Sequence, residues 1–211
     1  MSGQAMYSRA QRLLEIAAIA CFTLLAVACA WRLAVSVPAH WLPVLLAVGV
    51  PLGWLASDLF SGILHWAFDT LGSVHTPVIG PAFIRPFREH HADPQAMTRH
   101  DFVETHGASC LAALPVLGIA LTLRLDGFAS ALLSAWLLAV ALGALATNQC
   151  HKWAHMAPGD TPRAVRWLQR RGCVLPRAHH RRHHTPPFDS HYCMSCGWLN
   201  RPLNALLRAW R

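Results

Sequence analysis

Four long stretches of this chain contain no Asp, Glu, Lys or Arg, and no other feature limits its fold as strongly. They cover residues 16–31, 41–57, 107–123 and 127–150. An α-helix rises about 1.5 Å per residue, so roughly 17–25 apolar residues cross the hydrocarbon core of a bilayer. Arg32 can snorkel at the end of the first stretch, and the apolar pattern of the second resumes after Asp58. We therefore predict membrane spans over residues 13–36, 41–68, 107–124 and 127–150.

The composition agrees with a membrane protein. Hydrophobic residues make up 54% of the chain and charged residues 13%, whereas soluble domains carry about 25% charged residues. This composition argues against an ordinary soluble domain and rules out an intrinsically disordered chain. The connections after the first and third spans are short, and the second of them is Leu125-Asp126-Gly127. We expect an all-α integral membrane protein, one domain over residues 1–211, with four transmembrane helices in two hairpins.

The basic residues predict the orientation of the spans. Sixteen of the eighteen Lys and Arg residues lie before the first span, between the second and third, or after the fourth. By the positive-inside rule both termini are cytoplasmic, and residues 69–106 and 151–211 form a histidine-rich cytoplasmic cap. The high Ala and Arg content and the short loops suggest a bacterial inner membrane. A cleaved signal peptide is the alternative for the first span, since Ala28-Cys29-Ala30 resembles a cleavage site.

The histidines gather on the predicted cytoplasmic side. The chain has fourteen of them, and only His40 falls on the other side. His151 and His155 are four residues apart, as are His65 and Asp69, so on a helix each pair lies on one face. Further imidazoles come from His90-His91 and from the run His179-His180-Arg-Arg-His183-His184. Imidazole binds Zn, Cu, Fe and Ni, and this inventory is large enough for two metal ions.

Each histidine cluster also has a simpler explanation. A single pair four residues apart is more often incidental than a site, and the basic run near residue 180 could lie on anionic lipid. Because the clusters converge on one face of a membrane domain, we interpret them together as a metal centre. HExxH is absent, which disfavours zinc hydrolysis, and a transporter would place its ligands near the midplane. The lone pair Cys193 and Cys196 is a weak metal or redox signal.

The pattern is typical of membrane histidine-box di-iron oxidoreductases, and longer strings make the resemblance closer. These strings occupy residues 58–69, 83–94, 97–105, 147–155, 175–184 and 192–200. From about residue 52 to residue 204 the chain resembles the plasmanylethanolamine desaturase (CarF-like) family of lipid desaturases. Cys196 and His106 depart from the residues that we expect at those positions in this family.

The resemblance implies an O2-dependent di-iron lipid desaturase. Such an enzyme introduces the vinyl-ether double bond into 1-O-alkyl ether phospholipids, converting plasmanyl- to plasmenylethanolamine in plasmalogen synthesis. It implies two iron ions, O2 as co-substrate and an external electron donor, either a cytochrome b-type protein or a ferredoxin. An acyl-lipid desaturase or hydroxylase with the same centre is the alternative, and a membrane metal-binding protein is the non-enzyme alternative. No nucleic-acid partner is expected, since cytoplasmic basic segments explain the net charge of +8, and the oligomeric state stays open.

Spacing and the family pattern together imply nine metal ligands. They are His65, Asp69, His90, His91, His151, His155, His180, His183 and His184. A second set could bind metal or hold the ligands by hydrogen bonds, as metal-bound histidines usually require. These residues are His179, His100, Asn148, Glu89, Asp93, Asp101 and Glu104. Candidates for substrate binding are Asp58, which lies about 10 Å deeper than His65 on the same helical face, and Arg85, Arg88, Arg181 and Arg182. A structural role for Asp58 stays equally open.

Overall fold

The computed structural model describes residues 8–77 and 79–209, and among these residues every regular element is helical. Four helices are long and apolar enough to cross a membrane: Arg9–Ser36 (α1), Ala39–Thr70, Phe102–Thr122 (α5) and Phe128–His155 (α6). The prediction of an all-α membrane protein with four spans is confirmed. The predicted cap also includes residues 78, 210 and 211, which lie outside the described residues.

The second membrane helix is built from several helical types joined end to end. It begins with the short helices η1 (Ala39–Trp41) and α2 (Leu42–Val44), continues through the π-helical turn η2 (Leu45–Gly49), and ends as α3 (Val50–Thr70). Pro51 follows the π-helical turn, and its missing N–H explains why the regular hydrogen-bond ladder is interrupted there. The helix nevertheless continues across the membrane, as the apolar pattern predicts.

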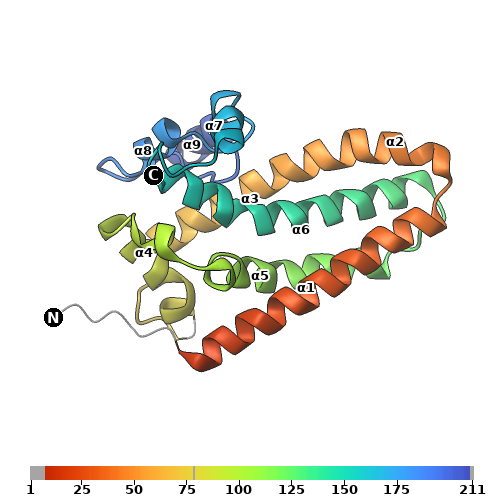
Figure 1. Cartoon of the computed structure of the whole chain (residues 1–211), viewed down its shortest axis with the longest axis horizontal. Helices are drawn as coiled ribbons and strands as arrows, with labels where there is room; N and C mark the ends of the chain where they lie inside the picture. The colour runs from red at the N-terminus through yellow and green to blue at the C-terminus, as the bar shows by residue number, and fades with distance from the viewer. Residues whose placement is uncertain (1–7, 78, 210–211) are drawn as a thin grey trace.

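The four membrane helices pack in the order α1, α5, α6, α3, so the main partner of α1 is α5 (Figure 1). Small residues allow the close approaches. An ideal Cβ at Gly53 would lie 2.5 Å from the Cβ of Ala139, so α3 and α6 touch through their backbones. At the far end, Arg32 of α1 donates hydrogen bonds to the carbonyls of Leu121 and Leu123, the latter at 2.9 Å. Arg32 therefore caps the last turn of α5.

Helix α5 begins five residues before the apolar stretch that predicts it. The side chain of Asp101 accepts the N–H of Glu104, and the side chain of Glu104 accepts the N–H of Asp101, both at 3.0 Å. This capping box satisfies the first turn of the helix with polar residues. Arg12 of α1 pairs with Asp101 at 2.7 Å and joins the two helices at this end.

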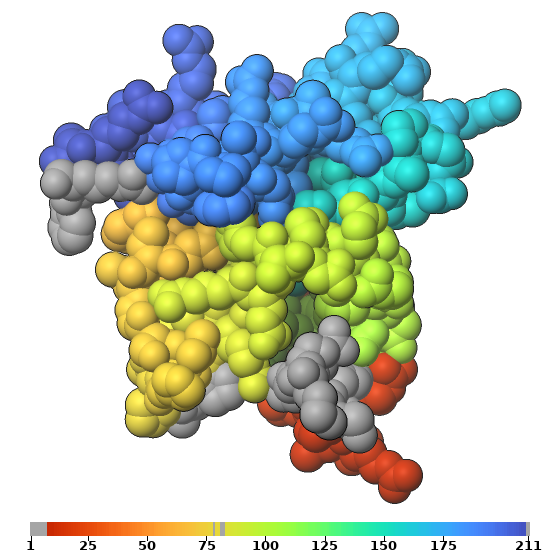
Figure 2. Space-filling model, turned by 90° about the vertical axis from the view of Figure 1, so that its left-hand side faces the viewer, coloured from red at the N-terminus to blue at the C-terminus, as the bar shows by residue number. Residues whose placement is uncertain are grey.

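The shorter helices gather at the end of the bundle where α3 and α6 finish (Figure 1). Between α3 and α5 lie η3 (Gly80–Ile84), α4 (Arg85–Ala92) and η4 (Ala96–Arg99), and after α6 lie α7 (Arg163–Arg170), α8 (Arg177–His183) and α9 (Asn200–Ala209). Viewed from this end, the blue segment that contains α8 lies against the yellow-green segment that contains α4 (Figure 2). Two segments far apart in the sequence thus cover the same helix ends.

Candidate metal centre

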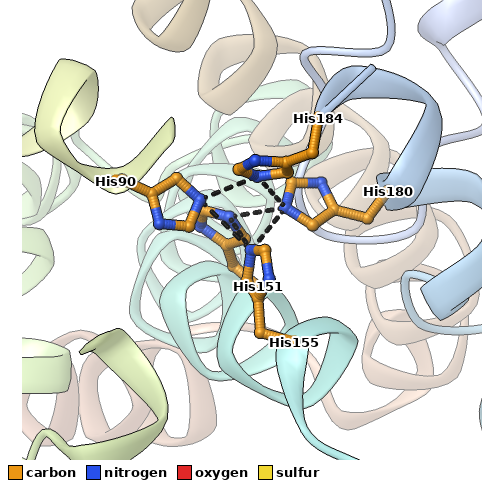
Figure 3. Close-up of side chains that lie close together, drawn as sticks. All are labelled: His90, His151, His155, His180 and His184. Atoms are coloured by element: carbon orange, nitrogen blue, oxygen red, sulfur yellow. Dashed lines mark hydrogen bonds between the residues drawn. The ribbon is translucent and has the colours of Figure 1, made fainter. Parts of the chain in front are cut away.

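Five histidines from three elements converge at this end of the bundle (Figure 3). They are His90 from α4, His151 and His155 from α6, His180 from α8, and His184 just after α8. Their Nε2 atoms face a common point, and neighbouring Nε2 atoms lie between 2.7 Å and 3.2 Å apart. We call this cluster the five-histidine group.

Hydrogen bonding alone does not account for this geometry. The five Nε2 atoms make six close contacts with one another, yet a neutral imidazole nitrogen either donates one hydrogen or accepts one. At most two of the contacts can therefore be hydrogen bonds at one time. Metal–nitrogen bonds of about 2.1 Å at right angles place neighbouring nitrogens roughly 3.0 Å apart. The spacing of the five nitrogens thus fits the coordination shell of a metal ion.

A second cluster stands beside the first. It joins His65 and Asp69 of α3, His91 of α4 and His183 of α8, and we call it the four-residue group. The Nε2 atoms of His65 and His183 are 3.0 Å apart, and Oδ2 of Asp69 lies 3.1 Å from Nε2 of His91. The other carboxylate oxygen of Asp69 is buried without a partner among the described residues. A metal ion would satisfy this carboxylate, so these residues also fit a cation.

Adjacent histidines in the sequence divide between the two groups. His90 enters the five-histidine group while His91 enters the four-residue group, and His184 and His183 divide in the same way. The rings of His91 and His184 have centroids 5.0 Å apart. The two groups therefore form neighbouring sites, and together they contain all nine residues that the sequence implies as ligands.

Burial keeps four histidines of the α4 and α8 segments neutral. His65 and His183 have no exposed surface, and His180 is 1% exposed. Burial lowers the pKa of His183 to about 3 and of His184 to about 4, and it holds the pKa values of His90 and His180 well below the usual range. The neutral rings keep their lone pairs available for a metal ion. The only anionic donor in either group is the carboxylate of Asp69.

Helical spacing positions four of the nine donors, and a hydrogen bond to the backbone fixes the ring of His183. His65 and Asp69, like His151 and His155, follow the four-residue spacing of a helix face. Nδ1 of His183 donates to the backbone carbonyl of Ser190 at 2.9 Å, which directs Nε2 into the four-residue group.

The four carboxylates expected to support the ligand histidines lie elsewhere, and this is a correction. Glu89 pairs with Arg85 at 3.9 Å, and Asp93 pairs with Arg99 at 3.0 Å. Asp101 and Glu104 form the capping box of α5. These side chains are close to the histidines in sequence, but they serve helix ends and surface pairs instead.

Three further candidates also lie outside both groups. Nε2 of His179 accepts a hydrogen bond from Nδ2 of Asn200 at 3.0 Å, so it faces the start of α9. His100 is exposed, and its backbone carbonyl accepts a hydrogen bond from Lys152. Asn148 is half-buried on α6, three residues before His151.

Asp58 anchors a loop, which is the structural one of the two roles expected for it and not the substrate-binding one. It is fully buried in α3, and Oδ1 accepts the N–H groups of Ser195, Cys196 and Gly197 at 2.9, 2.9 and 3.0 Å. Three backbone donors satisfy a buried carboxylate as a positively charged partner would. The pairing of Asp58 with this loop does not follow from the sequence, although an acidic residue inside an apolar helix indicates that a partner must exist.

The cysteines of this loop are structural. Both Cys193 and Cys196 are buried and free, and burial raises the pKa of Cys196 to about 12. Thiols with raised pKa values stay protonated and bind metal poorly. Neither cysteine belongs to the two clusters of possible metal ligands among the described residues, so the weak metal signal of this pair is not supported.

The arginines proposed for substrate binding have different environments. Arg85 pairs with Glu89, and Arg181 and Arg182 are exposed on α8. Arg88 donates from Nε to the carbonyl of Phe68 at 3.2 Å, and from Nη2 to those of Leu71 and Gly72 at 3.0 and 3.2 Å. Arg88 is thus held at the C-terminus of α3, close to Asp69.

Comparison with known proteins points to one family. The lipid desaturase domain family matches residues 54–211. The chain is 50% identical to a plasmanylethanolamine desaturase of Myxococcus xanthus, over 93% of this chain and 69% of the relative. It is 42% identical to plasmanylethanolamine desaturase 1 of Mus musculus, over 98% and 77% respectively. The chloroplastic fatty acid desaturase 4 of Arabidopsis thaliana is 32% identical over 72% of this chain and 46% of the relative. No solved structure matches.

The matched region contains every donor of the two groups, from His65 to His184. The two groups of clustered histidines, the membrane helices that carry part of them and the extent of the identity agree with one another. The chain therefore belongs to the lipid desaturase family, the membrane oxidoreductases that include the plasmanylethanolamine desaturases.

Proposed function

We propose that this chain is an O2-dependent di-iron desaturase that introduces the vinyl-ether double bond into 1-O-alkyl ether phospholipids. Its substrate would be a plasmanylethanolamine and its product the corresponding plasmenylethanolamine. The names of the relatives with 50% and 42% identity support this choice over an acyl-lipid substrate. One iron ion would be held by the five-histidine group and the other by the four-residue group.

The depth of the two groups is the observation that carries the proposal. Both groups lie where α3 and α6 end, at His65–Asp69 and His151–His155, and not midway along the spans. In a 1-O-alkyl phospholipid the carbons that lose hydrogen are the first two of the chain, directly beside the ether oxygen and the glycerol. These carbons lie at the head-group level of a bilayer, which is the level of a helix end.

The chemistry of the reaction fits this donor set. A bound di-iron centre supplies the strong oxidant that an unactivated alkyl carbon requires, which no side chain can provide. Two hydrogens leave the lipid, and with two electrons and two protons they reduce O2 to two molecules of water. Eight imidazoles and one carboxylate would hold the centre, and Asp69 would be the only donor in the two groups to add a negative charge. The loop anchored by Asp58 leads into α9, whose Asn200 donates a hydrogen bond to His179 of α8.

The orientation of the chain belongs to the same proposal. Fifteen of the seventeen basic residues in the described part of the chain are on the side of the metal groups, which supports a cytoplasmic location for this end and for both termini. A cytoplasmic cytochrome b-type protein or ferredoxin could then deliver the electrons. The short loops agree with a bacterial inner membrane.

Lipid analysis tests the proposal. A plasmalogen-free host is fed alkyl ether lipid and expresses the intact chain, the His155→Ala variant, or His40→Ala as a control outside both groups. We expect acid-labile vinyl ether with the intact chain and with His40→Ala, and none with His155→Ala. If protein that carries two irons and a working donor makes no vinyl ether, the ether-lipid assignment is wrong. A new double bond or hydroxyl on ester-linked chains would then identify the alternative enzyme.

A further inference from the structure

A cavity of about 400 Å³ opens directly onto the four-residue group. Asp69 and His91 form part of its wall, together with Arg88 and the loop around Phe188, whereas no member of the five-histidine group lines it. The ring of Phe188 stands edge-on to His91, with centroids 5.1 Å apart. The cavity is within the size range of small-molecule sites. It is therefore a route by which a ligand can reach the four-residue group.

Arg88 brings a positive charge to this cavity and makes no ion pair among the described residues, although the carboxylates of Asp69 and Asp189 also line the wall. Its three hydrogen bonds go to the neutral carbonyls of Phe68, Leu71 and Gly72. Two nearby arginines do have acidic partners, since Arg85 pairs with Glu89 and Arg99 with Asp93. The carbonyls fix the guanidinium through Nε and Nη2. The N–H groups of Nη1 have no acceptor among the described residues, so they can bind an anion.

An apolar row on α3 leads to the same place. Phe60 and Leu64 lie one turn apart and are 50% and 48% exposed, and Leu71 at the end of the helix is 52% exposed. The carbonyl of Leu71 is one of the acceptors that hold Arg88. A hydrocarbon chain in the bilayer could lie along this row and end beside the guanidinium.

We propose that this cavity binds the head-group end of the substrate phospholipid, with Arg88 on the phosphate and the four-residue group facing the reacting carbons. The inference rests on the proposed function. In a 1-O-alkyl phospholipid only the glycerol and the ether oxygen separate the phosphate from the carbons that lose hydrogen. A phosphate site must therefore share a cavity with the reacting metal site, as Arg88 does with Asp69 and His91. The five-histidine group holds the metal ion that is remote from the lipid.

Protection of a thiol from labelling measures this binding without turnover. The exposed Cys21 and Cys173 are first replaced by serine. Thr70→Cys then places a reporter on the cavity wall, and Thr122→Cys places a matched control at the other end of the bundle. Iron-loaded protein in detergent, without O2 or electron donor, is allowed to react with a maleimide in separate samples. Each sample contains one of three probes. The probes are 1-O-alkyl-2-acyl-glycerophosphoethanolamine, the 1-O-alkyl-2-acylglycerol that lacks the phosphate, and inorganic phosphate.

We expect the phospholipid to slow labelling of Thr70→Cys and to leave Thr122→Cys unchanged. Loss of one charge-assisted hydrogen bond corresponds to about tenfold or more in affinity, so the phosphate-free lipid should need at least tenfold higher concentration. Arg88→Gln should weaken protection by the phospholipid by a similar factor, and Arg88→Lys by less, since Lys keeps the charge.

Three results would overturn the inference. Equal protection by the phosphate-free lipid would show that Arg88 does not recognise phosphate, even if Arg88→Gln fails to fold. Protection by inorganic phosphate at the same concentration would identify a free-phosphate site. Absence of protection by every probe would remove the cavity as a binding site. Vinyl-ether formation without protection contradicts this inference alone, whereas protection without vinyl ether contradicts the proposed reaction alone.

Discussion

The Nε2 atoms of His65 and His183 lie 3.0 Å apart, although 118 positions separate the two residues in the sequence. His65 comes from a membrane helix and His183 from a short helix that follows the last span. Two buried imidazole nitrogens at this distance need either one shared hydrogen or a cation between them. A metal ion in the four-residue group would therefore join α8 to α3.

Replacing His183 should lower the metal content of the protein. His183→Ala leaves three donors in the four-residue group, so we expect the iron content to fall from two ions per chain to one. Elemental analysis after brief chelation measures this, with His40→Ala as the control that keeps both ions. Retention of two ions by His183→Ala would show that the four-residue group does not hold a metal ion by itself.

Replacing Asp58 should loosen the loop that it anchors. Asp58→Asn keeps the shape but removes the charge that accepts the N–H groups of Ser195, Cys196 and Gly197. A charged hydrogen bond contributes about 1.5–3 kcal/mol, so amide exchange in this loop should accelerate roughly tenfold to a hundredfold. Hydrogen exchange followed by mass spectrometry measures the rate. Asp126→Asn, at an exposed ion pair, should leave the loop unchanged. Unchanged exchange in Asp58→Asn would contradict the anchoring role.

Two glycines of α5 provide a matched test of the packing between α1 and α5. A Cβ at Gly107 would overlap the side chain of Glu15, whereas a Cβ at Gly118 would meet nothing within 4 Å. Gly107→Ala should destabilise the protein by about 1–3 kcal/mol, as overpacking does. Gly118→Ala should be neutral or slightly stabilising, because alanine favours the helix. Thermal unfolding in detergent compares the two variants, and equal midpoints would show that α1 and α5 are not in close contact at Gly107.

The ion pair between Arg12 and Asp101 should break only at low pH, when the carboxylate of Asp101 is protonated. The Arg12 guanidinium beside Asp101, together with the backbone N–H of Glu104, holds the pKa of that carboxyl below its usual value. A lowered carboxyl pKa stabilises the folded state above the ordinary value near 3.9, and the contribution disappears as the pH falls through the lowered value. Spin labels on the first turns of α1 and α5 should keep their separation from pH 7 to pH 5 and move apart only below about pH 4.

Asp101→Asn is the control for this acid response. Asparagine still caps the helix, so the variant removes the ion pair and leaves the cap. Its label separation should not depend on pH between 7 and 3. A change in the native protein between pH 7 and pH 5 would assign the response to another group.

Local features of the sequence predicted much of this structure. The absence of charge over long stretches revealed four spans, because hydrocarbon tolerates few charged residues. The four-residue spacing of His151 and His155 and of His65 and Asp69 placed each pair on one helix face, because helix geometry is local. The start of α5 was missed, since the polar capping box of Asp101 extends the helix beyond its apolar part.

The division of the ligands between the two groups and the contacts of Asp58 could be seen only in the structure. His90 and His91 are adjacent in the sequence but enter different groups, and spacing does not reveal this. Asp58 meets Ser195 across 137 positions, a contact that depends on how the loop before α9 folds onto α3. Long-range contacts of this kind follow from packing among several elements. Periodicity, which describes one element at a time, cannot provide them.

The most direct test of the account is a single turnover with purified protein. Iron-loaded, chemically reduced protein is mixed with 1-O-alkyl phospholipid and a limited amount of O2, and the lipid is analysed for vinyl ether. The account predicts about one vinyl ether for every two irons, and none from His183→Ala. Protein with two irons that consumes O2 but leaves the alkyl chain saturated, or that desaturates only ester-linked chains, would contradict the proposed reaction.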